Sequence, residues 1–256
     1  MALHFTQVIA IIESEARRLR HDPSEMLTRM IQPVMWIVIF GQAISKTHAI
    51  STGTVPYLDY MVPGILAQSI LLVSIFFGII LIWERDMGTL HKLLVTPTPR
   101  VLLVIGRAFA AGIRALFQLV TIYLLGLLLG IDLRWDLPAL CGVLMMVILI
   151  AAIFSTFSLI VAAIVKKRER FLGIGQALTM PLFFASNALY PLDSMPNWIR
   201  MVALVNPLTY QVDTLRSLMI VGQTSHFGLI ADFGISLAVF IILIAIAVRV
   251  YPKILY

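Results

Sequence analysis

ERDMGTLHKLLVTPTPR, residues 84–100, is a short polar segment between two long apolar stretches. Its apolar residues recur at helical spacing, which predicts an amphipathic helix over residues 84–95. The stretch Thr96-Pro97-Thr98-Pro99 ends this helix, because proline offers no backbone donor and disfavours the helical region for the residue before it. We therefore expect this segment to be the part of the chain that meets the cytosol.

The composition predicts an all-α integral membrane protein. Hydrophobic residues make up 60% of the chain, charged residues only 12%, and the mean hydropathy is +0.98, outside the range of soluble domains. A span needs roughly 20 apolar residues to cross about 30 Å of hydrocarbon. The uncharged runs predict six transmembrane helices in a single domain over residues 1–256. The expected spans are residues 26–45, 58–83, 108–131, 137–165, 171–191 and 230–250.

Shorter elements accompany the spans. Residues 4–21 predict an amphipathic helix lying in the inner membrane interface, and a new helix begins at Pro23 with Asp22 as its N-cap. Before the last span, the chain carries Asp213 and Arg216, and a charge at the centre of a span costs roughly 2.5–3.5 kcal/mol. We therefore expect short external or re-entrant helices there, on which these two side chains are spaced to pair.

The positively charged residues predict the orientation. Fifteen of the 19 Lys and Arg residues fall on one side, in the amino-terminal segment, the loops after spans two and four, and the tail. Both termini are therefore expected in the cytosol, with the protein in the plasma (inner) membrane of a bacterial cell. The net charge of +6 is assigned to topology and lipid headgroups, not to nucleic acid. The four basic residues on the opposite side are Lys46, Arg134, Arg200 and Arg216.

Arg100, Arg107 and Arg114 are seven residues apart and share one helix face. The favoured interpretation is that this helix starts in the cytosol and that the arginines extend to lipid phosphates. The alternative is that Arg107 or Arg114 pairs with Glu84 or Asp86 and braces the polar segment against the bundle.

Motifs for catalysis or for cofactors are not found in the sequence. It has no GxxxxGK[ST] phosphate loop, no G-x-S-x-G elbow and no H-E-x-x-H. The five histidines lack metal-ligand spacing, and the single cysteine, Cys141, allows no internal disulfide. We therefore expect that this chain is not itself an enzyme and binds no cofactor or metal of its own.

The polar segment carries a resemblance to a known family. The pattern Glu84-Arg85, Gly88-Thr89-Leu90, Leu93-Leu94, Thr96-Pro97 and Arg100 resembles the E-R/K-x-x-G-T-L-x-x-L-L-x-T-P-x-x-R signature of ABC-2 type permeases, the membrane subunits of a class of ATP-driven transporters. The drug-exporter and nodulation-exporter branch looks most similar. Softer matches at YMVPGIL (60–66) and NPLTYQVDTLR (206–216) extend the resemblance over essentially the whole chain.

The resemblance implies partners and a mechanism. A separate, dimeric cytosolic ABC ATPase, holding ATP and Mg, would drive two copies of this permease, and residues 84–95 would be the coupling helix seated in a groove of the ATPase. An ordinary interfacial helix is the alternative for this segment. A secondary transporter or channel that needs no ATPase is the alternative function, although no repeat between the halves is visible. The expected coupling residues are Glu84, Arg85, Met87, Gly88, Thr89, Leu90, Leu93, Leu94, Thr96, Pro97 and Arg100.

In this arrangement the coupling residues have separate roles. Glu84 and Arg85 would fix the angle at which span two meets the helix, the apolar residues would fill the groove or pack under it, and Gly88 would permit close backbone approach.

The apolar spans also bear on the substrate. Their few polar groups are neutral, so a multiply charged solute would lose its hydration without compensating partners. We therefore expect export of an apolar or amphipathic substrate, such as a drug-like molecule, a lipid or a lipid-linked glycan, by alternating access. Ordinary helix packing is the alternative role for the side chains expected along the pathway. These are Phe76, Phe77, Phe154, Phe157, Phe183 and Asn187.

Overall fold

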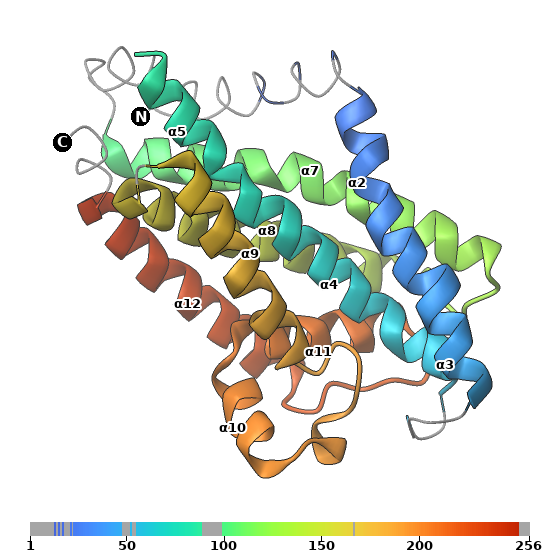
Figure 1. The fold of residues 1–256 in the computed structure, drawn as a ribbon. Helices are drawn as coiled ribbons and strands as arrows, with labels where there is room; N and C mark the ends of the chain where they lie inside the picture. Colours follow the sequence, from blue (N-terminus) through green and yellow to red (C-terminus); the bar gives the residue numbers. More distant parts are fainter. Residues whose placement is uncertain are drawn as a thin grey trace.

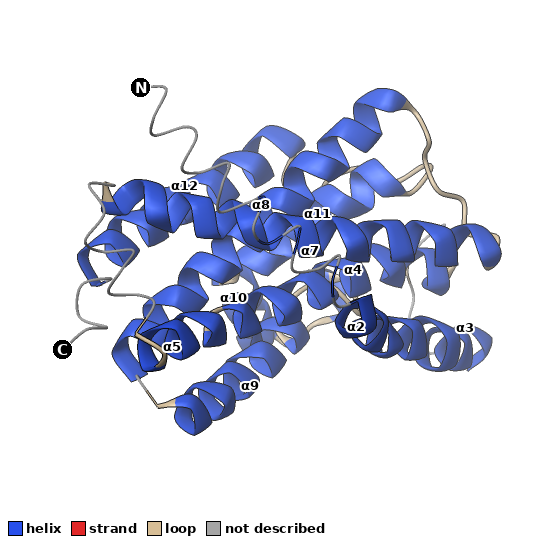
Figure 2. Cartoon of the chain, turned by 90° about the horizontal axis from the view of Figure 1, so that it is seen from above, coloured by secondary structure: helices blue, strands red, loops and turns tan. Residues whose placement is uncertain are grey.

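The computed structural model describes residues 13, 15, 17, 21, 23–47, 52, 55–88, 99–165 and 167–250. Within this part the chain is helical, as predicted, and has no strand beyond an isolated antiparallel bridge between Leu133 and Ile220 (Figure 2). The interfacial helix expected over residues 4–21 lies outside the described residues, apart from four single positions.

The first span consists of three consecutive helical segments. α2 (Pro23–Met35) begins at the expected proline, whose fixed φ suits the first helical position. Pro33 lies inside α2, and shortly after it the chain winds into a π-helical turn, η1 (Trp36–Gly41), before α3 (Gln42–Thr47). A proline inside a helix removes one backbone hydrogen bond, so the span departs from regular winding near it.

α4 (Tyr57–Phe77) and α8 (Leu137–Val165) form the centre of the bundle. They pack against each other, α4 also packs against α7 (Arg100–Leu128), and α8 also packs against α7 and α12 (Leu229–Val250). α8 carries no charged residue, which is typical of a helix in a large core or of a membrane span. Figure 1 shows α2 and α12 on opposite flanks of this centre.

Five of the six predicted spans correspond to helices with the length and composition of a membrane span. Among the described residues, five helices are long and apolar enough to cross a membrane. The expected fifth span corresponds to α9 (Arg168–Phe184), whose 17 residues extend about 25 Å at 1.5 Å per residue, less than the roughly 30 Å of hydrocarbon. The span was predicted to end at residue 191, because apolar residues continue in the sequence after the helix has ended at Phe184. The five helices are Leu27–Thr47, Tyr57–Asp86, Val101–Leu128, Leu137–Val165 and Leu229–Val250.

Between α9 and α12 the chain forms the short helices that the sequence led us to expect. After η2 (Leu192–Ser194), α10 (Asn197–Val205) lies at the end of the bundle opposite to α5 (Ile79–Asp86), with an exposed apolar face (Figure 1). α11 (Pro207–Met219) is instead inserted among α4, α8 and α12, and nearly all of its side chains are buried. Of these two helices, α10 therefore lies at the end of the bundle far from α5, and α11 lies inside the bundle.

The pair expected between Asp213 and Arg216 on α11 does not form. The Asp213 carboxylate accepts from the backbone N–H of His226, 2.6 Å away in the loop before α12. Arg216 donates to the backbone carbonyls of Tyr60 and Asn187 at 3.2 and 2.7 Å, with its guanidinium 3.6 Å from the Tyr60 ring centroid. Each charged side chain thus ties α11 to a different neighbour, because buried backbone groups compete for them.

Asn206 connects α11 to the end of α9. Its side-chain oxygen accepts from the Leu208 N–H at 3.0 Å, which caps α11, and Pro207 follows at the first helical position. Its amide nitrogen donates to the carbonyls of Leu182 and Ala185 at 2.7 and 2.9 Å, groups that the end of α9 leaves without helical partners. One side chain therefore satisfies two helix ends.

Two substitutions at Asn206 separate these contributions. Asn206→Ser keeps a capping oxygen but loses the amide donor, and should lower stability by ~1–3 kcal/mol because two partly buried carbonyls lose their partner. Asn206→Ala also loses the cap and should cost about 1 kcal/mol more. Thermal unfolding of the purified protein in detergent measures both, and a Ser variant as stable as wild type would show that the tie to α9 is not needed.

Candidate functional site

The polar segment 84–100 begins as the end of span two. Glu84, Arg85 and Asp86 are the last residues of α5, which continues the line of α4 to the end of the bundle that we call the inner end (Figure 1). The helix stops there, and Gly88 has a φ of +71°, a conformation that favours glycine. The helix predicted to begin at Glu84 is therefore wrong at its start, because residues 84–86 belong to the helix of span two.

The described part of the segment ends at Gly88. Among the described residues, none has an atom within 4 Å of where a Cβ on Gly88 would lie, and the positive φ is the feature of the described structure that favours glycine there. Met87 beside it is 69% exposed. Arg100 is described as the first residue of α7. The expected coupling residues outside the described part are Thr89, Leu90, Leu93, Leu94, Thr96 and Pro97.

Arg107 of α7 pairs with Glu84 of α5. The guanidinium donates from Nη2 to Oε2 of Glu84, and the Arg107 side chain is 7% exposed. The favoured expectation, that this arginine reaches lipid phosphate, is therefore wrong, and the alternative pairing is confirmed. The physical reason is that a charge inside an apolar bundle is stabilised by a nearby opposite charge.

Arg114, two turns further along α7, forms a second buried pair. Its Nε donates to Oε1 of Glu15 at 2.8 Å, and its guanidinium lies 5.5 Å from the ring centroid of Phe77 at the end of α4. Glu15 is one of the few described residues of the amino-terminal segment. This pair therefore connects the segment before the first span to α4 and α7, a link for which the sequence offered no signal beyond the arginine itself.

A third contact joins α5 to α9. The guanidinium of Arg168, in the first turn of α9, lies 4.9 Å from the ring centroid of Trp83, and such cation–π contacts are worth ~0.5–2 kcal/mol. The sequence assigned the basic turn around Arg168 to topology, so this contact was missed. We call Trp83, Glu84, Arg107 and Arg168 the inner cluster. It attaches the end of span two to α7 and α9.

The expected substrate residues are mostly part of the bundle core. Phe77, Phe154 and Phe183 are buried in the main apolar core, while Phe76 and Phe157 are half-buried. Asn187 is also buried, and its backbone carbonyl accepts from Arg216. None of these six residues lines the cavity that the structure shows between α7, α8 and α12.

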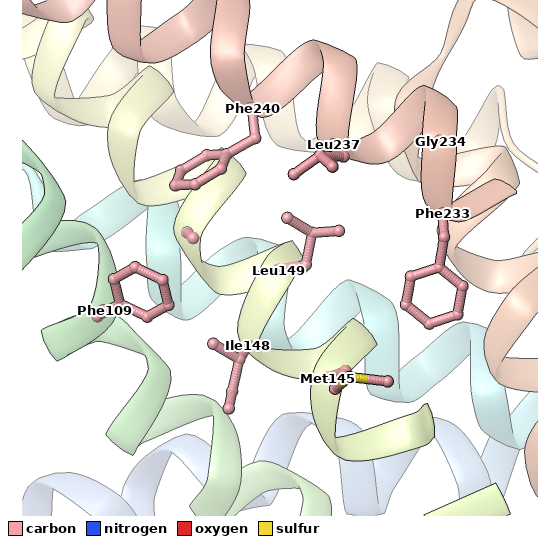
Figure 3. Close-up of a pocket in the computed structure, with 9 residues that line it drawn as sticks. Phe109, Met145, Ile148, Leu149, Phe233, Gly234, Leu237 and Phe240 are labelled. Carbon is pink, nitrogen blue, oxygen red and sulfur yellow. The ribbon is translucent and has the colours of Figure 1, made fainter. Parts of the chain in front are cut away.

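A cavity of about 540 Å³ lies instead between α7, α8 and α12 (Figure 3). Phe109 and Phe240 face each other across one end of it with ring centroids 6.5 Å apart. These positions could not be singled out from the sequence, because apolar residues in an apolar span carry no individual signal. The lining residues are Phe109, Met145, Ile148, Leu149, Ala152, Phe233, Gly234, Leu237 and Phe240.

The side chains at the inner end are suited to mechanical contact. Those that the structure describes comprise ion pairs, a cation–π contact and the exposed side chain of Met87. In the part of the chain that the structure describes, no three His, Cys, Asp or Glu side chains are grouped so as to hold a metal ion.

Comparison with known proteins identifies the family of this chain. Residues 6–220 match the ABC-2 type transporter family. The chain is 32% identical over 203 residues to ycf38 of Cyanophora paradoxa, named as a transport permease, covering 78% of this chain and 70% of that protein. It is 29% identical to DrrC of Mycobacterium tuberculosis and 23% identical to DrrB1 of Streptomyces coeruleorubidus, named as doxorubicin and daunorubicin resistance ABC transporter permeases, with 78% of this chain and 71% and 70% of theirs covered. The chain belongs to the ABC-2 type transporter family.

Proposed function

We propose that this chain is the permease subunit of an ATP-driven ABC exporter and works with a separate cytosolic ATPase. The observation that carries the proposal is the inner cluster. Because Glu84 contacts Arg107 and Trp83 contacts Arg168, a force applied to the segment after α5 reaches α7 and α9 as well as span two. The relatives named as ABC transporter permeases support the same function.

The complex that follows contains two copies of this permease and two ATPase subunits with bound ATP and Mg. Met87, exposed at the end of α5, begins the apolar face that enters the ATPase groove. Leu90, Leu93 and Leu94 continue that face in the sequence. Membership of the ABC-2 family favours this complex over a secondary transporter or a channel. No feature of the described bundle indicates either of these alternatives.

The proposed topology has six spans, with α9 as a short fifth one, and both termini in the cytosol of a cell bounded by its plasma membrane. The charge distribution supports it, since 15 of 19 basic residues fall on the side of the polar segment. The inner end of the bundle is then the cytosolic end, and α10 faces outward.

The proposed substrate is apolar or amphipathic. Two observations support this class: the cavity between α7, α8 and α12 is lined by apolar side chains only, and α8 is free of charge along its whole length. Half-buried Phe76 and Phe157 offer further contact surface between helices. The names of two relatives refer to resistance to doxorubicin and daunorubicin.

The topology is tested by labelling from outside. In a Cys141→Ser background, which removes the exposed native thiol, a membrane-impermeant thiol reagent on intact cells should label Ser194→Cys but not Arg170→Cys. Both positions are exposed in the structure, so the difference reports the side of the membrane. Labelling of Arg170→Cys from outside would overturn the six-span arrangement.

The coupling role is tested at the Glu84–Arg107 pair. Glu84→Ala should leave the permease in the membrane but lower transport about tenfold or more, while the ATPase runs uncoupled, because the force path to α7 is cut. The exchange variant Glu84→Arg with Arg107→Glu should restore part of the transport. Normal transport by Glu84→Ala would show that the pair does not transmit force.

A matched control for this test lies at the outer end. Asp193→Ala removes an exposed pair in which Arg200 Nη2 lies 3.6 Å from Asp193 Oδ1. Exposed pairs contribute little, so its transport and ATPase activity should equal those of wild type.

The substrate class is tested by ATPase stimulation in the reconstituted complex. Hydrophobic compounds should stimulate hydrolysis, and a sugar, an amino acid or an inorganic ion should not. Gly234 lines the cavity, and a Cβ there would have no atom within 4 Å, so Gly234→Leu should fill part of the cavity and reduce the stimulation. Gly173→Leu on α9, where a Cβ is equally unobstructed but away from the cavity, should not reduce it. Stimulation confined to the polar solutes would contradict the proposed class.

A further inference from the structure

Span two is interrupted at Gly78. α4 ends at Phe77 and α5 begins at Ile79, and the Gly78 N–H donates to the side-chain oxygen of Ser158 at 3.0 Å. The Ser158 hydroxyl in turn donates to the carbonyl of Ile75. A side chain of α8 is therefore inserted into the backbone hydrogen-bond ladder of span two, one of the recognised causes of a helix break.

The hydroxyl supplies hydrogen-bond partners to backbone groups at the break. In an unbroken α-helix, the Gly78 N–H would donate to the carbonyl of Ser74. Here that N–H is directed to the side-chain oxygen of Ser158 and to the carbonyl of Phe76. Inside a membrane bundle, an unpaired backbone group costs several kcal/mol, and Ser or Thr side chains commonly supply the missing partner at a break. Ser158 is 1% exposed, so its hydroxyl is a buried partner for the Gly78 N–H and the Ile75 carbonyl.

The same place is a close contact between two backbones. A Cβ on Gly78 would lie 2.7 Å from the carbonyl oxygen of Ser158 and 3.0 Å from its carbonyl carbon. Distances under 3.0 Å require a shift of the neighbour, and here the neighbour is backbone. Only glycine at position 78 lets α8 approach closely enough for the Ser158 hydroxyl to reach into span two.

The packing of the bundle changes at this break. The side chains of α4 belong to the main apolar core, whereas Leu81 and Ile82 of α5 belong to a second cluster at the inner end with Leu159 of α8 and Phe171 of α9. The buried side chains of the two halves of span two therefore belong to different apolar clusters, while half-buried Ile80 of α5 still packs against the main core. The change from one cluster to the other falls within a turn of Gly78.

We propose that Gly78 and Ser158 form a joint at which α5 swings relative to α4 during transport. α5 carries the inner cluster, so its rotation moves α7 and α9, while the Ser158 hydroxyl keeps the backbone groups of the break paired. Hinges of this kind need only a few residues to absorb the change. Ser158 is thus a positioning residue. The proposal rests on the proposed function for the source of the force, which is the ATPase.

The joint is tested by comparing two serine substitutions in one helix. Ser158→Ala removes the hydroxyl from the break, and Ser155→Ala removes an equally buried hydroxyl that bonds only to Ala152 within α8. In the complete reconstituted complex, at equal amounts of assembled complex, Ser158→Ala should hydrolyse about fivefold more ATP per substrate moved, the factor expected from one lost hydrogen bond. Ser155→Ala should equal wild type. Equal ratios for the two variants would overturn the joint.

A second variant covers the case in which Ser158→Ala reduces assembly. Ser158→Cys keeps the side-chain volume nearly unchanged but offers a weaker hydrogen-bonding group, so it should give a ratio between those of wild type and Ser158→Ala. If the Ser158→Ala complex fails to assemble and the Ser158→Cys complex hydrolyses as much ATP per substrate moved as wild type, the joint is contradicted.

A distance measurement separates failure of the joint from failure of the proposed function. Spin labels at Asp86→Cys on α5 and Ser194→Cys at the outer end, in the Cys141→Ser background, report the position of α5 in the permease alone. Wild type and Ser155→Ala should show the same narrow distribution, and Ser158→Ala a broader one. Identical distributions for all three would overturn the joint, whereas failure of an ATPase to co-purify with wild type would overturn only the proposed function.

Discussion

Backbone amide and carbonyl groups inside an apolar bundle must find partners, and the structure meets this constraint with a few polar side chains. Ser158 serves the break in span two, Asn206 serves the end of α9, and Arg216 serves the carbonyls of Tyr60 and Asn187. In water such groups would be solvated, but in hydrocarbon an unpaired one costs several kcal/mol. The few buried polar side chains therefore determine where helices may break, end and insert.

Charged side chains obey the same constraint at the inner end. The spacing of Arg107 and Arg114 identified the face of α7 on which they lie but not their partners. Both arginines are buried against carboxylates, one from α5 and one from the amino-terminal segment. A partner 99 residues away in the sequence, as Glu15 is from Arg114, leaves no local pattern. Burial and pairing, which are properties of the packed bundle, decide between lipid phosphate and protein.

What the sequence predicted well are the local features. The helical class, the helix start at Pro23 and the helix of span three beginning near Arg100 follow from hydropathy, N-capping and proline geometry, and the structure shows all three. The break at Gly78 was not predicted, because a glycine in an apolar run reads as part of a continuous span until its neighbour is known. The sequence left open whether α11 is external or re-entrant, because its two charged side chains bond to backbone groups contributed by other parts of the chain.

Span two is interrupted, whereas α7 and α8 are continuous, and this difference explains why a force at the inner end would act on span two first. α7 and α8 pass without interruption from the main core into the apolar cluster that contains Leu81, Ile82 and Phe171, so bending either helix distorts a continuous hydrogen-bond ladder. Span two is already interrupted where the two clusters meet, and its interrupted groups bond to a side chain that rotates about its own χ1. A small rotation there therefore strains less backbone than the same rotation in its neighbours. In the proposed joint, the contacts of Glu84 with Arg107 and of Trp83 with Arg168 would pass that rotation to α7 and α9.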